Sequence, residues 1–301
     1  MTGAAASAPR AVPVLEIGGT HVTAALVTLS RAPTIDESHR LALTSGGAAD
    51  DIVARLLEAA ATVAPDHPAP WGVAIPGPFD YEAGIGRFAD VGKFDSLNGY
   101  PLGRVLLERL GASARSMRFV NDADAFGIGE QAAGAARGNE RAVCLSLGTG
   151  IGSAFIADGL PVNDGPEVPP DGSAHRLVWQ GRPLEDTVSR RALRASYAEV
   201  TGERPDVHEI ADRARQGDAI AARVFDDALR VLGVAIGPWV RSFHATVLVV
   251  GGSIAGSWDL VAPPLVAGLA DAGAGDAVVV PAEHPNDAPL FGAASWAVSS
   301  T

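Results

Sequence analysis

Short apolar runs along the chain end at glycine turns, and this pattern predicts buried strands in an α/β protein. The runs cover residues 12–17, 142–147 and 245–250. Runs of this length, rich in Val, Leu and Ile, are typical of strands buried on both faces of a sheet. The turns that follow them are Gly18-Gly19-Thr20, Gly148-Thr149-Gly150 and Gly251-Gly252-Ser253.

The first two turns share a layout that predicts two related domains. Residues 12–29 read as strand, glycine-threonine turn and returning strand, and residues 142–159 repeat this order about 130 residues later. Glycine amides and a threonine hydroxyl can bind phosphate closely, so we expect a nucleotide phosphate chain to be held between the domains. A tight hairpin that needs only glycine's backbone freedom explains either turn alone. The third turn precedes a helix, where Gly-Gly can pack against adenine and ribose.

Helical spacing of apolar residues predicts the remaining large elements. Helices are expected over residues 50–64, 102–110, 182–200, 206–216 and 218–243. Irregular polar loops are expected over residues 88–100 and 163–182, and loops of this size often carry binding residues.

The predicted elements group into two domains. Residues 1–10 read as a disordered tail, 11–120 as an N-terminal domain and 121–287 as a C-terminal domain, with a last helix at about 288–301 that packs back on the first.

The polar centre of the sequence is FVNDADAFGIGE, residues 119–130. A buried strand ends here, Asn121 and Asp122 follow, and a helix of small residues begins. Such junctions place polar side chains at the carboxyl edge of a sheet, where α/β enzymes keep their sites. A carboxylate there can accept a proton from a substrate hydroxyl, which phosphoryl transfer requires. Asp122 taken alone could be only the N-cap of the helix, and the glycine turns favour catalysis.

Composition narrows the classes of partner. The 301 residues are 47% apolar, enough for two domain cores, and the net charge of −12 argues against nucleic acid or an anionic membrane as the main partner. Phosphate must then be held by backbone amides, helix ends and metal. No targeting segment and no apolar run long enough for a membrane span is visible, so a cytoplasmic protein is expected.

Cysteine and lysine each occur once, which excludes several kinds of site. Cys144 lies in an apolar run, which favours an inert strand residue and excludes a disulfide framework or a thiolate zinc cluster. Lys93 is the only lysine, so no Walker-type Gly-Lys-Ser/Thr loop exists.

Read in order, the motifs EIGGTHVTAALV, IPGPFD, FVNDADAFGIGE, LSLGTGIG and VVGGS resemble those of the ROK family of repressors, open reading frames and sugar kinases. The resemblance extends from Val12 to Val298. It implies an α/β fold of two actin-like, hexokinase-like ATPase domains (ribonuclease H-like) with a cleft between them. It also implies ATP and Mg²⁺ as cofactors and a homodimer.

The resemblance assigns roles to individual residues. It implies Asp122 as the general base and Asn121, His175 and Glu185 as sugar ligands. We further expect Pro76, Gly77 and Asp95 to contact the substrate. Nucleotide contacts are expected at Gly18, Gly19, Thr20, His21, Gly148, Thr149, Gly150, Gly251, Gly252 and Ser253. From the residues alone, a single histidine such as His175 is usually a surface residue, and Glu185 could simply complement a helix dipole.

Three departures from the family pattern bear on the chemistry. The usual first acid, aspartate, is Glu16 here, which alters a water-mediated contact to magnesium. Residues 177–183 contain no cysteine, so no structural zinc is expected. The Glu-x-x-His pair that grips sugar hydroxyls reads Gly172-Ser173-Ala174-His175, and one carboxylate is lost unless Asp171 or Glu167 substitutes. A site without a partner for a hydroxyl loses discrimination.

The sequence therefore predicts an ATP-dependent kinase acting on a hydroxyl, the primary one, of a hexose or hexose-like acceptor. A kinase of C7-cyclitols or aminocyclitols is the nearest alternative, because of the missing carboxylate. A non-catalytic sugar-sensing regulator shares the scaffold. Only about ten residues precede the first strand, and the chain is acidic, so no DNA-binding module is expected.

Overall fold

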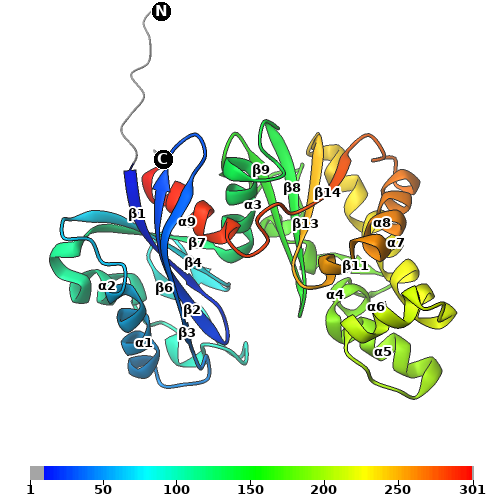
Figure 1. The fold of residues 1–301 in the computed structure, drawn as a ribbon, viewed down its shortest axis with the longest axis horizontal. Helices are drawn as coiled ribbons and strands as arrows, with labels where there is room; N and C mark the ends of the chain where they lie inside the picture. The colour runs from blue at the N-terminus through cyan, green and yellow to red at the C-terminus, as the bar shows by residue number, and fades with distance from the viewer. Residues whose placement is uncertain (1–9, 300–301) are drawn as a thin grey trace, which may run out of the picture. The chain divides into compact units, whose positions relative to one another are not determined.

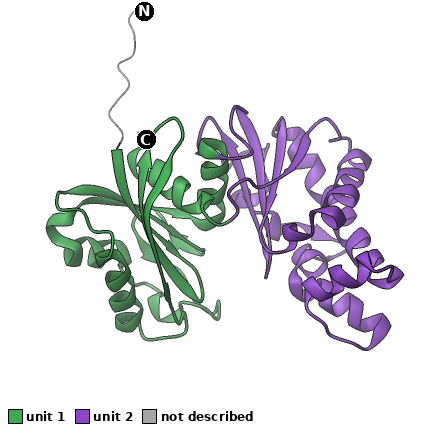
Figure 2. Ribbon diagram, viewed as in Figure 1, with its two compact units in different colours: residues 1–133, 286–301 green, residues 134–285 purple. Residues whose placement is uncertain are grey.

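The computed structural model describes residues 10–299, which divide into two compact units. Unit 1 runs to Ala133 and takes up the chain again from Asn286, whereas unit 2 is Gly134–Pro285 (Figure 2). The tail predicted for residues 1–10 lies outside the described residues except for Arg10, which begins the first strand.

Unit 1 contains a five-stranded sheet in the order β3-β2-β1-β4-β7. The pairs β1–β2 and β2–β3 are antiparallel, whereas β1, β4 and β7 are parallel. Every residue of β4 is buried, as expected of a central strand covered on both faces. The strands are β1 Arg10–Ile17, β2 His21–Leu29, β3 Thr34–Ala42, β4 Ala69–Ile75 and β7 Ala114–Asn121.

Unit 2 repeats this architecture with the sheet order β10-β9-β8-β13-β14. Again the first three strands pair antiparallel and the last three are parallel. The prediction of two related α/β domains with actin-like topology is confirmed. The strands are β8 Arg141–Leu147, β9 Ile151–Ala157, β10 Leu160–Pro161, β13 Val247–Gly251 and β14 Val278–Pro281.

Helices pack beside the sheet in each unit (Figure 1), and each unit has an apolar core that includes buried helical residues, such as Leu56 in unit 1 and Leu229 in unit 2. Residues 102–110 form a helix as predicted, and the helices expected at 206–216 and 218–243 begin after Asp206 and Asp218, which cap them. Unit 1 has α1 Ala49–Ala61, α2 Leu102–Leu110, α3 Asp122–Ala133 and α9 Ala288–Val298; unit 2 has α4 Glu185–Val188, α5 Arg190–Thr201, α6 Val207–Arg215, α7 Ala219–Ser242 and α8 Trp258–Asp271.

Short elements fill the connections. Two small hairpins pair β5 with β6 and β11 with β12. These elements are β5 Phe79–Asp80, β6 Ile85–Gly86, η1 Asp95–Leu97, η2 Gly111–Ser113, η3 Pro170–Gly172, η4 Ala174–Arg176, β11 Val178–Trp179, β12 Arg182–Pro183 and η5 Ile254–Ser257.

One predicted helix is wrong. Residues 182–200 do not form a single helix, because Arg182–Pro183 is strand β12 and the backbone becomes extended at Ser189, between α4 and α5. The Ser189 hydroxyl accepts a hydrogen bond from the Ala192 amide at 3.2 Å and so caps α5. The apolar residues Leu184, Val188 and Ala192 keep a helical spacing across this break, which hides it in the sequence.

The first boundary between the units falls after Ala133 rather than after residue 120, because α3 packs against α9 within unit 1. A Cβ atom on Gly129 would collide with the Ala288 carbonyl, and one on Gly292 with the Ala125 carbonyl. The two helices therefore touch at their backbones, which only glycine permits. No helix in residues 10–299 is both long and apolar enough to cross a membrane.

Candidate active site

Three parallel strands of unit 1 bring Asn121, Asp122 and Pro76 to one edge of the sheet. The register pairs Glu16 of β1 with Ala74 of β4, and Ile75 of β4 with Asn121 of β7. The carboxyl ends of these strands therefore meet, and Gly18, Pro76 and Asp122 follow them directly. This is the edge at which open α/β sheets bind ligands.

Asn121 is held in one orientation by a hydrogen bond that the sequence analysis missed. Its Nδ2 donates to the Tyr81 hydroxyl at 2.9 Å, and that hydroxyl donates in turn to the Ile75 carbonyl at 3.3 Å. Its Oδ1 accepts from the Ala123 amide at 2.9 Å. Tyr81 also lies beside Gly77, where a Cβ atom would be 3.3 Å from the tyrosine oxygen. The Asn121 amide is thus fixed between α3 and Tyr81.

The side chains of Asn121 and Asp122 accept hydrogen bonds from backbone amides in the first turn of α3. The Asn121 oxygen also lies 3.4 Å from the Asp124 amide, the usual position of an N-cap contact. The Asp122 carboxylate also accepts from the Ala123 amide, at 2.9 Å. Asn121 is therefore the main N-cap of α3. Helix capping alone does not explain why residue 122 is an aspartate.

The Asp122 side chain is exposed, so a ligand can reach it. Desolvation by the surrounding protein raises the pKa of its carboxyl group, while the positive charge of Lys93 and the Ala123 amide act in the opposite direction. A raised pKa makes the carboxylate a better proton acceptor than an ordinary surface aspartate.

Lys93 lies in an anchored loop. The neighbouring Phe94 is fully buried against Phe88, with ring centroids 5.3 Å apart, and its amide donates to the Ser45 carbonyl at 2.8 Å. The Asp95 Oδ1 atom accepts from the backbone amides of Val91 and Gly92 at 3.3 and 3.1 Å. Asp95, a predicted substrate ligand, therefore uses one carboxylate oxygen to close its own loop.

The glycine turn of unit 1 is covered by the next residue along the chain. The His21 ring lies over Gly18, where a Cβ atom would be 3.0 Å from its Cε1. Its Nε2 is 3.5 Å from Glu16 Oε2, and its Nδ1 is 3.3 Å from the Thr20 hydroxyl. Gly19 has open space, since the nearest atom to a Cβ would be the Ser45 hydroxyl at 3.9 Å.

The two glycine turns of unit 2 lie together. A Cβ atom on Gly148 would be 3.6 Å from the Ser253 hydroxyl, and β8 pairs with β13 up to Gly251. Gly252 has a φ of 85°, and a Cβ there would collide with the Leu147 backbone. Glycine is therefore required at Gly252 both for its conformation and for its contact. The exposed Thr149 lies between Gly148 and Gly150 in the first of these turns.

Glu185 lies beside one of these turns. A Cβ atom on Gly150 would be 2.7 Å from Glu185 Oε1, so the carboxylate rests against the turn. His175 is exposed on η4, which is held to β9 by a 2.7 Å hydrogen bond from the Ala174 amide to the Ser153 hydroxyl. The Leu184 amide donates to the Leu177 carbonyl at 2.8 Å and closes the β11–β12 hairpin between His175 and Glu185. His175 and Glu185 thus flank the open end of this hairpin, away from its turn at Gln180 and Gly181.

Gly172, where the family pattern has a glutamate, adopts a left-handed backbone conformation. Gly172 has a φ of 64°, and a Cβ atom there would be 2.5 Å from Asn163 Oδ1, so a glutamate at this position would be strained. The two alternative carboxylates are engaged elsewhere. Asp171 pairs with Arg176 at 2.7 Å, and Glu167 pairs with Arg141 at 2.8 Å.

Magnesium can be accommodated without a protein cage, because this ion keeps most of its waters and takes one or two carboxylates together with substrate phosphates. Glu16, partly exposed at the glycine turn of unit 1, has the chemistry of such a contact. No group of three or more His, Cys, Asp or Glu side chains that could hold a metal occurs among residues 10–299.

Comparisons with known proteins agree with this architecture. The model of the ROK family matches residues 13–166 and 180–300, leaving out the segment that carries Gly172 and His175. A glucokinase of Thermotoga maritima is 29% identical over 308 residues, covering 93% of this chain and 95% of that protein. An N-acetyl-D-glucosamine kinase of Haemophilus influenzae is 25% identical over 204 residues, covering 61% and 64% of the two chains.

Solved structures show the same fold. The ROK hexokinase from Thermus thermophilus superposes with a TM-score of 0.77 at 24% identity, covering 95% of this chain and 97% of that one. A ROK family glucokinase from Streptomyces griseus, solved with glucose and AMPPNP, superposes with a TM-score of 0.75 at 24% identity, covering 95% and 98%.

Proposed function

The chain belongs to the ROK family, and we propose that it is an ATP- and magnesium-dependent kinase that phosphorylates a hydroxyl, the primary one, of a hexose or hexose-like alcohol. The observation that carries the proposal is the pairing of an exposed carboxylate, Asp122, with an amide fixed by Tyr81 at the carboxyl edge of unit 1. Similarity to sugar kinases over most of the chain supports the reaction class.

Asp122 is the general base in this proposal. It accepts the acceptor's hydroxyl proton while the oxygen attacks the γ-phosphorus of ATP, and the bond from that phosphorus to the bridging oxygen of ADP breaks. Asn121 offers an amide to a neighbouring hydroxyl of the acceptor. Its orientation is set before the acceptor binds, because Tyr81 and the first turn of α3 already hold it.

The glycine turns provide the nucleotide contacts. Backbone amides of Gly19 and Thr20 and of Thr149 and Gly150 donate to phosphate oxygens, whereas the Gly18 and Gly148 amides already donate to the carbonyls of His21 and Gly150 at 2.8 and 3.0 Å. Gly251 to Ser253 pack against adenosine. Magnesium, when bound, neutralises charge on the phosphates, and Glu16 contacts its water shell. His21 restrains Glu16 and Thr20 on the same turn through its two ring nitrogens.

His175 and Glu185 are the proposed ligands of the acceptor's remaining hydroxyls. The absence of a carboxylate at Gly172 leaves one hydroxyl of a plain hexose without its usual partner, and Asp171 and Glu167 are ion-paired with arginines. This specific feature favours the second candidate, a kinase of C7-cyclitols or aminocyclitols.

A panel of acceptors separates the candidates. Glucose, mannose, N-acetylglucosamine and several cyclitols would each be incubated with ATP and Mg²⁺, and ADP release would be followed by a coupled assay. Turnover confined to hexoses supports the first candidate, and turnover confined to cyclitols supports the second. If sugars bind but none is phosphorylated, the kinase proposal is wrong and a sensor function replaces it.

A further inference from the structure

A pocket of about 410 Å³ opens in unit 1 at the amino ends of the parallel strands. Arg10 begins β1, Ala69 begins β4, and Arg115 is the second residue of β7. The candidate active site follows the opposite, carboxyl ends of the same strands. Strand β1 alone spans eight residues, or about 25 Å at about 3.3 Å per residue. The pocket is therefore a separate place in the molecule.

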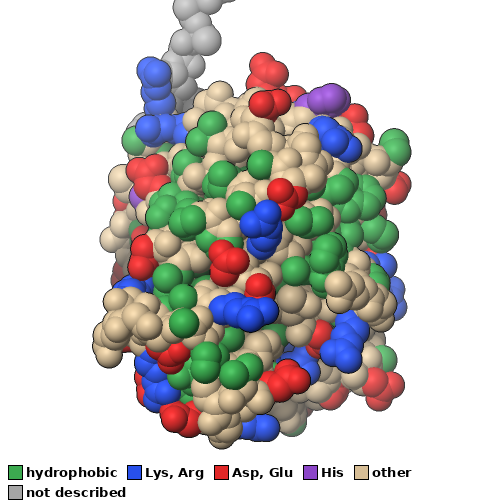
Figure 3. Space-filling view, turned by 90° about the vertical axis from the view of Figure 1, so that its right-hand side faces the viewer, with side chains coloured by type: hydrophobic (Ala, Val, Ile, Leu, Met, Phe, Trp, Pro, Cys, Tyr) green, Lys and Arg blue, Asp and Glu red, His purple; other side chains and the backbone are tan. Residues whose placement is uncertain are grey.

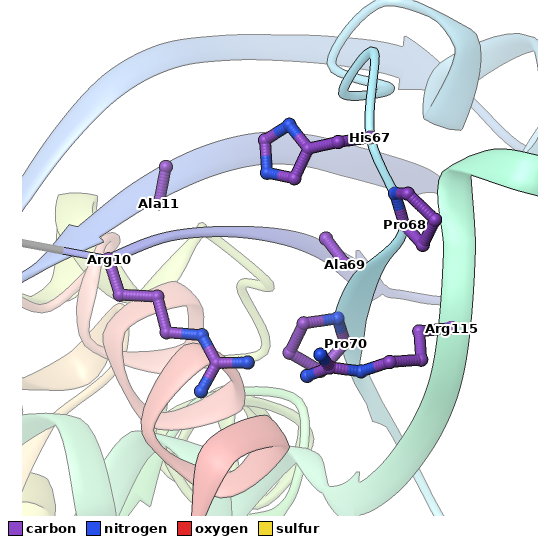
Figure 4. Close-up of a pocket in the computed structure, with 7 residues that line it drawn as sticks. All are labelled: Arg10, Ala11, His67, Pro68, Ala69, Pro70 and Arg115. Carbon is purple, nitrogen blue, oxygen red and sulfur yellow. The ribbon is translucent and has the colours of Figure 1, made fainter.

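The pocket is lined by basic groups and prolines, without a carboxylate. Figure 4 shows Arg10 and Arg115 extending toward each other, with His67 above them. The remaining lining residues are Ala11, Pro68, Ala69 and Pro70. The prolines lack amide protons and are conformationally stiff, so they form a rigid wall rather than hydrogen-bonding partners.

A β-bulge gives Arg115 its position. Ala69 pairs with Ala114 and Pro70 pairs with Ser116, so Arg115 is the extra residue on β7 with no partner on β4. Bulges of this kind redirect a side chain at the edge of a sheet. Pro70 on the facing strand cannot donate a ladder hydrogen bond, which is consistent with a bulge at this point.

The charges in the pocket are not neutralised within the part of the chain that the structure describes. The side chains of Arg10 and Arg115 form no ion pair or hydrogen bond within residues 10–299, and residues 1–9 contain no acidic side chain. Several arginines elsewhere are paired with a carboxylate, as Arg213 is with Glu203 and Arg230 with Asp271. On the face shown in Figure 3, blue and red side chains alternate. Two cations that converge without a counter-charge, in a chain of net charge −12, favour a bound anion.

We propose that this pocket binds a small phosphate-bearing metabolite, with Arg10 and Arg115 on the phosphate group. Guanidinium groups match phosphate oxygens with two parallel hydrogen bonds, and a dianion balances two such groups. The volume leaves room for an organic part beside the phosphate, where His67 and the proline wall supply polar and apolar contacts. This site and its ligand are independent of the reaction proposed above.

Isothermal titration calorimetry tests the site in the full chain. Inorganic phosphate and glycerol 3-phosphate would be titrated separately with saturating AMPPNP and Mg²⁺ present, so that the nucleotide turns are occupied. Both probes should bind the unmodified chain, and affinity should fall at least tenfold in Arg10→Gln/Arg115→Gln. Tighter binding of the ester would show that the pocket also holds the organic part, and equal affinity would show recognition of the phosphate alone.

The matched control is Arg40→Gln/Arg109→Gln, which removes the same charge from exposed positions of the same unit. It should bind both probes as the unmodified chain does. The proposal would be overturned if both double variants lost the same affinity for the probes. It would also be overturned if the unmodified chain showed no measurable binding at millimolar phosphate. If Arg10→Gln/Arg115→Gln does not fold, the probe affinity of Arg115→Gln alone, at the exposed bulge, would be compared with that of the unmodified chain.

Discussion

The glycine turns of unit 1 and unit 2 follow equivalent strands, β1 and β8, in sheets of the same strand order. Their surroundings differ. In unit 1 the turn is covered by His21, its immediate neighbour in sequence, and its Thr20 and Gly19 carbonyls accept from the amides of Leu43 and Ser45 at 2.9 and 3.3 Å. In unit 2 the turn touches Glu185 and Ser253, which lie far along the chain, and the Arg190 amide donates to the Gly148 carbonyl at 2.8 Å.

The two units share one sheet topology, but their long connections place different side chains at the sheet edges. The long connection of unit 1 joins β4 to β7 and carries Tyr81 and Lys93 to the edge where Asp122 lies. The long connection of unit 2 joins β10 to β13 and carries Glu185 to the glycine turn itself. The sheets are equivalent, and the inserted segments decide which chemistry reaches each edge.

The largest effect is expected in unit 1, at Asp122. Asp122→Asn should lower kcat by about two to four orders of magnitude, because the amide cannot accept the hydroxyl proton. Steady-state kinetics with the best acceptor from the panel would measure this. Asp66→Asn, an exposed control on the same unit, should keep normal turnover. Near-normal turnover of Asp122→Asn would contradict the assignment.

The same variant should not lose stability at neutral pH. Desolvation raises the pKa of Asp122 above its unfolded value of about 3.9, so ionisation costs the folded state free energy. That cost is absent below the unfolded pKa and complete above the folded one. Thermal unfolding at pH 7 should therefore give Asp122→Asn a midpoint at or above that of the unmodified chain, and the difference should vanish in acid.

Substitutions in the two turns test their different surroundings. Gly150→Ala should displace the Glu185 carboxylate, 2.7 Å from the new methyl group, and raise the acceptor KM roughly tenfold, as expected for a lost charged hydrogen bond of about 1.5 kcal/mol. Gly19→Ala meets nothing closer than 3.9 Å and should leave the acceptor KM unchanged at saturating ATP. Equal acceptor KM values in both variants would show that Glu185 does not bind the acceptor.

A smaller effect is expected at Tyr81. Tyr81→Phe removes the hydroxyl that fixes Asn121, and the acceptor KM should rise about fivefold for roughly 1 kcal/mol, with kcat little changed because Asp122 is retained. Tyr100→Phe, in the same inserted segment of unit 1, is the matched control and should leave both constants unchanged. A fall in kcat without a change in KM would rule out a positioning role.

The smallest effect concerns pH. The charge of Lys93 lowers the pKa of Asp122, against the desolvation that raises it. Lys93→Met should therefore move the acid limb of the kcat/KM profile to higher pH, whereas Lys93→Arg, which keeps the charge, should restore it. A limb that stays in place in Lys93→Met would mean that the two groups are not coupled in the free protein.

Local patterns predicted the strands and turns well, because each glycine turn follows a continuous apolar run. Residues 102–110 and the caps at Asp206 and Asp218 were equally visible. The break at Ser189 was hidden, because apolar residues keep helical spacing on both sides of it. Whether α3 joins unit 1 depends on its contact with α9, which is distant in sequence.

Residues of the candidate site can be named from the sequence, but their arrangement cannot. Asn121, Asp122, Gly150 and Glu185 could be named from the motifs they occupy. The hydrogen bond from Asn121 to Tyr81 joins residues 40 positions apart, and no local pattern signals it. The bulge that exposes Arg115 arises from the pairing of β4 with β7, which is likewise a property of the folded sheet.

The backbone contact between α3 and α9 has a consequence for biosynthesis. Asp122 begins α3, and α3 packs against residues that the ribosome adds more than 150 positions later, between 288 and 298. Unit 2 is continuous and can acquire its core as it leaves the exit tunnel. Unit 1 instead cannot complete the contact between Gly129 and Ala288 until translation has reached that final helix.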